Sequence, residues 1–213
     1  MIRLLRLPKQ APTDRIAAFI DGFNVYHGLR SKGFSRFYWL DYRALAETFV
    51  RDGETLASVK YFTSRVRHPP GDVKDQSTYI DALKARGGLE VIEGSYERRP
   101  MKCPDCGHWW KRPTEKMTDV NVATDIIAGA LRDEYDTALL ICADADLVPA
   151  VRLARSEGKR IIIVSPRGRT SDELVKQGDA HLHIPNAVLG RCQLPNPITT
   201  AEGVVLKRPT TWV

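Results

Sequence analysis

Short runs of apolar residues recur along the chain and alternate with longer stretches in which apolar residues fall every three or four positions. Such runs, bounded by polar residues, are typical of strands that are buried on both faces of a parallel sheet. The expected strands are residues 16–20, 57–66, 89–92, 138–143 and 160–165. With helices between them, they predict an α/β fold in which helices flank both faces of a parallel sheet.

The longer stretches define the expected helices and the limits of the domain. The expected helices are residues 41–51, 72–86, 119–133, 147–156 and 171–176. Residues 95–114 interrupt the alternation and are expected to form a small insertion that contains cysteines. Prolines and weak periodicity predict an extended C-terminal tail over residues 186–213. We therefore expect one domain over residues 15–185, preceded by an N-terminal extension over residues 1–14.

Aspartates follow two of the expected strands. Asp21 comes directly after residues 16–20, with Asn24 three positions later, and Asp144 and Asp146 follow the strand at 138–143. The carboxyl ends of parallel strands share one edge of the sheet, where ligands bind. Two carboxylates there repel each other unless a proton or a cation intervenes, and a divalent metal is the obvious cation. The alternative is helix capping by Asp21 and Asp146, which leaves Asp144 without a role.

Two further aspartates lie on the helix that precedes this strand. Asp119 is near the amino end of the helix, and Asp125 is six positions later. Six positions advance about 600° around a helix, so the two side chains do not line up and at most one reaches a metal directly. We expect Asp119 to be that residue, unless it only caps the helix. Asp125 is expected to support the site by hydrogen bonding to a neighbour.

The insertion contains a close pair of cysteines. Cys103 and Cys106, followed by Gly107 and His108, match the turn of a zinc knuckle, in which two thiolates take adjacent corners of a tetrahedron. This is half a zinc site. His108 can supply a third ligand, and the fourth would come from Cys192, His68 or a second subunit, which leaves a homo-oligomer open. The alternative is a reduced cysteine pair in a turn.

The insertion is also rich in positive charge. The chain carries a formal charge of +6, and residues 95–116 contain six basic and three acidic residues. Adjacent tryptophans can stack on unpaired bases while the cations contact phosphates, which favours single-stranded RNA as partner. The candidate RNA-binding residues are Arg98, Arg99, Lys102, Trp109, Trp110, Lys111, Arg112 and Lys116. The alternatives are a solvated loop and tryptophans that cover the insertion.

Nothing in the sequence indicates a membrane. No apolar run reaches the length of a transmembrane helix, and Pro8 and Lys9 interrupt the basic, partly apolar N-terminus before it could serve as a secretory signal. We therefore expect a cytoplasmic protein without a membrane partner.

Three segments together resemble a known family. Residues 19–24, 115–120 and 140–147 are similar to the three signature segments of NYN-domain proteins, which belong to the PIN-like superfamily of metal-dependent ribonucleases. The resemblance extends over residues 15–185 and implies a PIN-like, Rossmannoid fold. It implies that Asp21, Asp119, Asp144 and Asp146 ligate Mg²⁺ or Mn²⁺, with support from Asn24 and Asp125. A divalent metal then activates water for attack on the phosphodiester.

The chain departs from the family pattern near its last two signature aspartates. The family usually has Ser-Gly before Asp144 and Phe after Asp146, whereas this chain has Cys142, Ala143 and Leu147. Alanine adds a methyl group where glycine allows the backbone to approach closely. All the carboxylates of the pattern are retained.

Two other functions fit parts of the sequence. The segment after residues 138–143 also looks like the first motif of haloacid-dehalogenase-type phosphatases, with Asp144 as nucleophile and Asp146 as acid and base. Ser165 would then bind phosphate and Lys176 would be the later lysine, but Asp21 and Asp119 would have no role. A non-catalytic RNA-binding module is the other alternative.

Overall fold

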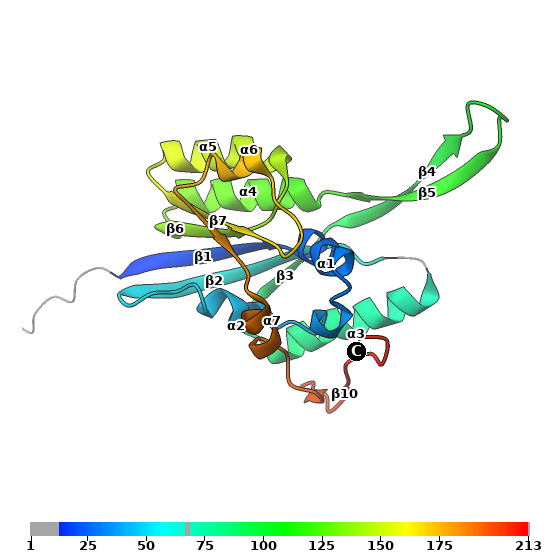
Figure 1. The fold of residues 1–213 in the computed structure, drawn as a ribbon, viewed down its shortest axis with the longest axis horizontal. Coiled ribbons are helices and arrows are strands. Elements are labelled where there is room, and N and C mark those ends of the chain that lie inside the picture. The colour runs from blue at the N-terminus through cyan, green and yellow to red at the C-terminus, as the bar shows by residue number, and fades with distance from the viewer. Residues whose placement is uncertain (1–12, 67–68, 213) are drawn as a thin grey trace, which may run out of the picture.

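The computed structural model describes residues 13–66 and 69–212, and for residues 96–99 and 111–115 it describes the backbone alone. A six-stranded sheet, ordered β3-β2-β1-β6-β7-β8, forms its centre, and every neighbouring pair of strands is parallel (Figure 1). The strands are β1 (Asp14–Asp21), β2 (Glu54–Thr63), β3 (Glu90–Glu93), β6 (Thr137–Ile141), β7 (Arg160–Ser165) and β8 (Ala180–His183). This sheet confirms the predicted α/β fold.

The order of the strands creates a crevice at one point of the sheet. From β1 the chain builds outward through β2 to β3, then returns to the other side of β1 and builds outward through β6, β7 and β8. β1 and β6 are neighbours, and the connections that follow them therefore run to opposite sides of the sheet. In open parallel sheets, ligands bind at the carboxyl ends of the strands at such a switch point.

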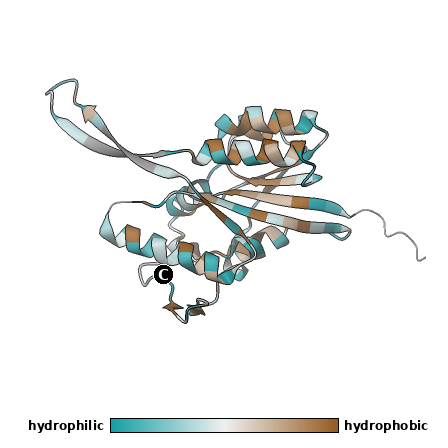
Figure 2. Ribbon diagram, turned by 180° about the vertical axis from the view of Figure 1, so that it is seen from behind, coloured by the Kyte–Doolittle hydropathy of each residue, from teal (hydrophilic) through white to brown (hydrophobic). Residues whose placement is uncertain are grey.

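Helices cover both faces of the sheet. One face carries α1 (Gly22–Ser31), α2 (Tyr42–Glu47), α3 (Pro70–Arg86) and α7 (Asn186–Arg191), and the other carries α4 (Thr118–Leu131), α5 (Val148–Ser156) and α6 (Asp172–Val175). Short 3₁₀ helices, η1 (Ser35–Phe37) and η2 (Ala145–Leu147), lie in the connections. The central strands are strongly apolar in Figure 2, as strands buried on both faces must be.

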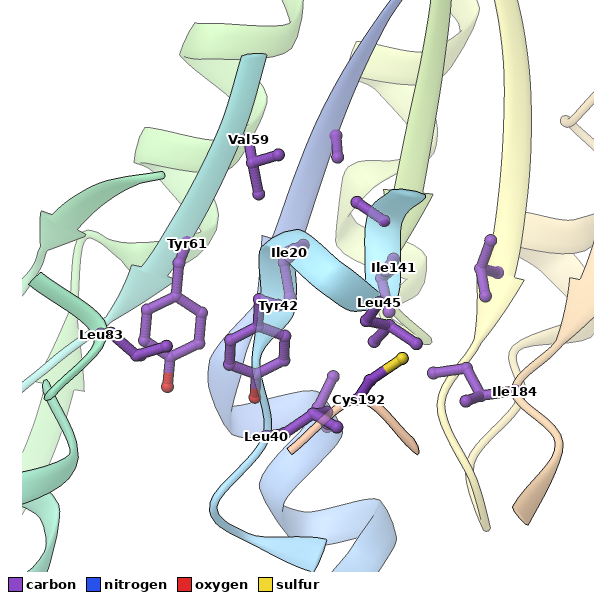
Figure 3. Close-up of a cluster of buried hydrophobic side chains, with 14 of the residues drawn as sticks. Ile20, Leu40, Tyr42, Leu45, Val59, Tyr61, Leu83, Ile141, Ile184 and Cys192 are labelled. Carbon is purple, nitrogen blue, oxygen red and sulfur yellow. The ribbon is translucent and has the colours of Figure 1, made fainter. Parts of the chain in front are cut away.

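Alternation along the strands divides the core into two clusters. In β1, Ile16, Ala18 and Ile20 pack against the first helical face, whereas Ala17 and Phe19 pack against the second. Figure 3 shows the first cluster, in which Tyr42 and Leu45 of α2 lie over Ile20 and Ile141 of the sheet.

The predicted insertion is an antiparallel hairpin. It consists of β4 (Ser95–Lys102) and β5 (Trp109–Lys116), and it projects from the body of the domain between β3 and α4 (Figure 1). Its base therefore leads directly into the helix that carries Asp119.

The C-terminal segment is more ordered than the extended tail that the sequence predicted. After β8 come α7 and a small antiparallel pair, β9 (Ile198–Thr199) and β10 (Val205–Leu206). The backbone N–H of Leu194 donates to the Trp39 carbonyl at 2.9 Å, and the Trp39 indole Nε1–H donates to the Pro195 carbonyl at 3.1 Å. These hydrogen bonds fix the segment on the first helical face, and sequence periodicity did not reveal them because the partners lie far apart in the chain.

Within the described part of the chain, no helix combines the length and the apolar character needed to span a membrane.

Candidate functional site

The first carboxylate of the candidate site is Asp21, the last residue of β1. Its side chain is buried at 2% exposure and caps α1, because Oδ1 accepts a hydrogen bond from the Asn24 backbone N–H at 2.9 Å. Oδ2 accepts from the Asn24 amide Nδ2 at 2.5 Å. Burial raises the pKa of the Asp21 carboxyl, and these hydrogen bonds offset part of the rise. Asp21 therefore does cap α1, but capping alone does not explain why a carboxylate is buried at the switch point.

The side-chain oxygen of Asn24 lies next to this carboxylate and is a second possible metal ligand. Asn24 is buried, and within the described part of the chain its Oδ1 has no hydrogen-bond partner. Buried polar atoms are nearly always paired, so an unpaired amide oxygen next to a buried carboxylate calls for an explanation. A bound cation would explain it, because the Asn24 amide oxygen and the Asp21 carboxylate could both coordinate the cation.

Asp144 and Asp146 follow β6, the strand next to β1. Asp144 is half-buried and caps η2, because its Oδ1 accepts from the Asp146 backbone N–H at 3.0 Å. Asp146 is exposed and makes no capping bond to α5, whose N-cap is Leu147. Asp146 therefore does not cap the following helix, which was the alternative that the sequence left open, and Asp144 caps only the short η2.

Asp119 lies in the first turn of α4 and is not its cap. The N-cap is Met117, which has a left-handed backbone (φ 78°) and makes no capping bond with its side chain. Loss of hydration raises the pKa of Asp119 to about 6, although the residue stays open to solvent, and the charges of Asp21, Asp144 and Asp146 contribute to the rise. Aspartates from three separate segments thus act on one another at the carboxyl edge of the sheet.

Asp125 faces a different partner. Its Oδ2 forms an ion pair with Lys60 Nζ of β2 at 2.9 Å, and both side chains are largely buried. This contact ties α4 to the sheet two turns beyond Asp119. A supporting role for Asp125 in the site remains a prediction.

The donor set suits a hard divalent cation. Among the described residues, no three His, Cys, Asp or Glu side chains are already arranged as metal ligands. The available donors are carboxylate oxygens that repel one another and the unpaired amide oxygen of Asn24, which are the ligand types that Mg²⁺ and Mn²⁺ prefer. These residues fit a divalent metal that would draw the carboxylates together.

Cys142 also contacts this centre, which was not predicted from the sequence. Ile20 of β1 pairs with Ile141 of β6, so the residues that follow them, Asp21 and Cys142, also lie side by side. The Cys142 thiol is buried and donates to Asp21 Oδ2 at 3.5 Å. Burial raises the pKa of this thiol well above its usual range, so it stays protonated as a donor. Only the pairing of β1 with β6 could have revealed this contact.

The sequence that forms this site matches a known protein family. The sequence model of the NYN domain matches residues 15–185. The chain belongs to the NYN-domain family. NYN-domain proteins are PIN-like, are generally nucleases, generally use divalent metals and generally bind RNA.

Two individual proteins are similar to this NYN-domain chain. A 6-hydroxy-3-succinoylpyridine 3-monooxygenase from Pseudomonas putida is 27% identical, over 93% of this chain and 75% of its own length. The crystal structure of a protein of unknown function from Vibrio parahaemolyticus is similar in fold, with a TM-score of 0.56 and 21% identity over 84% of this chain and 97% of its own.

The cysteine pair lies at the tip of the hairpin of this NYN domain. Cys103 is half-buried, Cys106 and His108 are exposed, and the Cys103 N–H donates to the His108 carbonyl at 2.8 Å. Backbone N–H groups of Cys106 and Asp105 lower the pKa of the Cys103 thiol, which favours the thiolate that a metal needs. Zinc binding remains a prediction.

One of the fourth zinc ligands that the sequence suggested, Cys192, lies away from the hairpin tip. Cys192 is buried in the first core cluster at 4% exposure (Figure 3), so it is not a ligand at the tip. His68 lies outside the described residues. A fourth ligand from His68 or from a second chain stays a prediction.

The tryptophans of the hairpin do not cover it. Trp109 and Trp110 are 61% and 43% exposed, and Lys102 Nζ lies 5.6 Å from the centre of the Trp109 ring. The side chains of Arg98, Arg99, Lys111 and Arg112 lie outside the described part of the structure. The backbone pairs Arg99 with Arg112, so basic positions occur on both strands of the arm. Lys116 is at its base and is half-buried.

An aromatic cavity lies beside the acidic centre, and it was not predicted from the sequence. The cavity has a volume of about 520 Å³ and lies between α1, α2, α3 and the C-terminal segment. Gly22 and Phe23, which directly follow Asp21, form part of its wall. Its walls come from distant segments, so no local pattern in the sequence indicated it.

Proposed function

We propose that this NYN domain hydrolyses phosphodiester bonds of single-stranded RNA with a divalent metal, Mg²⁺ or Mn²⁺, held by Asp21, Asp119, Asp144 and Asp146. The observation that carries the proposal is the convergence of Asp21, at the end of β1, with Asp144 and Asp146 after the neighbouring β6 and with Asp119 in the first turn of α4, where loss of hydration and then the charges of the other three raise the pKa of Asp119 to about 6. Carboxylates gathered in this way are unfavourable without a cation. Membership of a family whose members are generally nucleases supports the same conclusion.

Hydrogen bonds within the chain orient the carboxylates of this centre. Asn24 and Cys142 hold the Asp21 carboxylate by three hydrogen bonds, so its orientation is fixed before any ligand arrives. Asp144 is held by the backbone N–H of Asp146. When bound, the metal supplies an activated water nucleophile and offsets the charge that develops on the phosphate. The fixed carboxylates set where that charge is stabilised.

The hairpin is proposed to guide the RNA strand toward this centre. Its exposed Trp109 and Trp110 rings offer stacking surfaces, and the basic positions of both strands offer phosphate contacts. Because β5 leads into α4, a strand held on the arm would approach Asp119 first. A zinc ion on Cys103, Cys106 and His108 would stiffen the tip of the arm.

Incubation of the purified protein with end-labelled single-stranded RNA in Mn²⁺, Mg²⁺ or EDTA tests the proposal. Cleavage with either metal and none with EDTA is the expected result. RNA binding without cleavage would support the non-catalytic module instead. Turnover of phosphomonoesters alone would support the phosphatase, in which Ser165 would bind phosphate, although its Oγ is already within 2.8 Å of His181 Nε2.

A second candidate function comes from the similarity to the monooxygenase of Pseudomonas putida, whose name gives a substituted pyridine as its substrate. The aromatic cavity beside Asp21 favours this candidate, because it can enclose a single ring. Substrate-dependent oxygen consumption with a hydroxypyridine, in the presence of NADH as the electron donor, would support it. Absence of oxygen consumption together with metal-dependent RNA cleavage would exclude it.

A further inference from the structure

We infer that the aromatic cavity is a binding site for one planar heteroaromatic ring, and that Trp212 forms part of its wall. Seven of the eighteen residues that line the cavity are Phe, Tyr or Trp, and they come from segments that lie far apart in the chain. The aromatic residues that carry the argument are Tyr26, Tyr38, Tyr42, Tyr61, Tyr79 and Trp212.

The size and walls of the cavity suit a single ring system. A volume of about 520 Å³ is in the range of small-molecule sites and holds a ring with one substituent, but not a folded polymer. Tyr42 and Tyr61 stack with ring centres 4.5 Å apart and an angle of 25° between the rings, and Figure 3 shows their hydroxyl groups pointing the same way. Flat aromatic walls favour flat ligands, because rings stack offset or edge to face.

The inner wall is fixed before a ligand binds. Tyr42, Tyr61 and Tyr79 are all buried, and the Tyr79 hydroxyl donates to the Leu40 carbonyl at 2.6 Å. Gly22 is needed for this packing, because a Cβ atom at this position would lie 2.6 Å from the Tyr61 ring. A preorganised wall of this kind lowers the entropy that ligand binding costs.

The outer wall comes from the C-terminal segment. Trp212 packs edge to face on Tyr38 and Tyr79, at 5.4 and 5.6 Å between ring centres. Thr211 Oγ1 donates to Asp75 Oδ2 of α3 at 2.7 Å, which anchors the segment beside α3 (Figure 1). Trp212 lies outside residues 15–185, which the NYN domain matches, so this closure is an addition to the family domain.

The charges around the cavity would orient a substituted ring. Arg30 lines the side formed by α1, and Asp72 and Asp75 line the side formed by α3. A ligand with an anionic group would place that group at Arg30 and away from Asp72. Nucleobases with an attached phosphate and heteroaromatic acids both combine a planar ring with an anionic group.

The position of the cavity links it to the acidic centre. Gly22 and Phe23 line the cavity and directly follow Asp21, so the backbone that leaves the first carboxylate forms part of the cavity wall, although Asp21 itself does not line it. For the nucleobase this link rests on the proposed nuclease function, in which the base next to the reacting phosphate would occupy the cavity. For a free ring compound, the inference does not depend on the proposed nuclease function.

Calorimetric titration of the full chain tests the inference, with EDTA present so that neither metal binding nor cleavage contributes. The probes are AMP, UMP and 6-hydroxynicotinate, with ribose 5-phosphate as the ligand that lacks a ring. We expect at least one ring compound to bind with one ligand per chain, and ribose 5-phosphate to bind at least about tenfold more weakly. Tightest binding of a nucleotide identifies RNA as the source of the ring, and tightest binding of 6-hydroxynicotinate identifies a free small molecule.

Two variants locate the site. Trp212→Ala should weaken binding of the ring compound by about tenfold, whereas Leu153→Ala, at an exposed position of α5 on the other helical face, should leave it unchanged. If Trp212→Ala does not fold, Tyr26→Ala opens the same cavity from α1 and should show the same loss. Equal binding of ribose 5-phosphate, no binding of any ring compound, or an equal loss in Leu153→Ala would overturn the inference. A negative nuclease assay would leave these results unaffected.

Discussion

The Cys142 thiol donates a hydrogen bond to the buried carboxylate of Asp21, with 3.5 Å between Sγ and Oδ2. This contact joins β1 to the residue after β6 across the switch point of the sheet. It gives a physical role to one of the positions at which the chain departs from the usual family pattern. A serine at this position could make the same hydrogen bond, so the departure preserves a donor to Asp21.

The first prediction concerns this donor. Cys142→Ser should leave Mn²⁺ affinity within about twofold of wild type, whereas Cys142→Ala should weaken it by about fivefold, the equivalent of one ordinary hydrogen bond. The alanine variant loses a donor that favours the charged form of Asp21. Calorimetric titration with Mn²⁺ measures both, and thermal unfolding shows whether each variant folds. Equal Mn²⁺ affinity in Cys142→Ala and wild type would show that the thiol only fills space.

The second prediction concerns pH and the ion pair between Arg15 and Asp136. Hydrogen bonds from the Arg15 side chain, and then from its backbone N–H, lower the pKa of Asp136 from 3.8 to about 2. A carboxyl whose pKa is lower in the folded protein stabilises it above the unfolded value, and this contribution disappears as the pH falls toward the folded value. Asp136→Asn should therefore lower stability at pH 7 and have progressively less effect between pH 4 and pH 2, on the scale set by these two pKa values.

Denaturant unfolding at several pH values measures this effect. Asp52→Asn, an exposed position in the turn before β2, is the matched control and should have little effect at any pH. A stability difference for Asp136→Asn that stays constant down to pH 2 would contradict the assignment of the shift to Arg15.

The third prediction concerns the close approach of α1 to the loop after β7. A Cβ atom at Gly28 would lie 2.4 Å from the backbone oxygen of Arg167, which cannot move as a side-chain tip can. Gly28→Ala should therefore cost about 1–3 kcal/mol of unfolding free energy. Gly71→Ala in α3, where a Cβ meets nothing within 4 Å, is the control and should be neutral or stabilising by up to about 1 kcal/mol. Similar unfolding curves for the two variants would mean that α1 can shift.

The fourth prediction concerns the hairpin. Trp110→Ala should weaken binding of single-stranded RNA by about 1–3 kcal/mol if one base stacks on the ring, and should affect double-stranded RNA less. Replacing Lys111 and Arg112 with Ala should reduce the dependence of affinity on salt, by a slope of about 0.7 for each phosphate that the variant no longer neutralises. Fluorescence anisotropy over a series of salt concentrations measures both. Unchanged affinity and slope would mean that the RNA enters elsewhere.

The sequence predicted the parts of this protein that depend on local pattern. Buried strands are visible in the sequence as apolar runs, and the rule that parallel strands end at one edge was enough to bring Asp21 and Asp144 together. The phase of α4 was also sufficient to separate Asp119 from Asp125, which pairs with Lys60.

The features that the sequence did not predict depend on contacts between distant residues. The hydrogen bond from Cys142 requires the pairing of β1 with β6, and the cavity requires Trp212 to pack against Tyr79, which lies far earlier in the chain. Prolines in the C-terminal segment suggested an extended chain, whereas its hydrogen bonds to Trp39 hold it on the core. Such contacts have no periodic signature in the sequence.

The most direct test of the acidic centre is the rate of cleavage of single-stranded RNA by Asp144→Asn in Mn²⁺, compared with wild type and with Asp52→Asn. We predict that Asp144→Asn abolishes cleavage while the metal-free variant is at least as stable as wild type, because one of the repelling carboxylates is gone. Asp52→Asn should cleave at the wild-type rate. Cleavage by Asp144→Asn as fast as by wild type would contradict the claim that these aspartates hold the metal for hydrolysis.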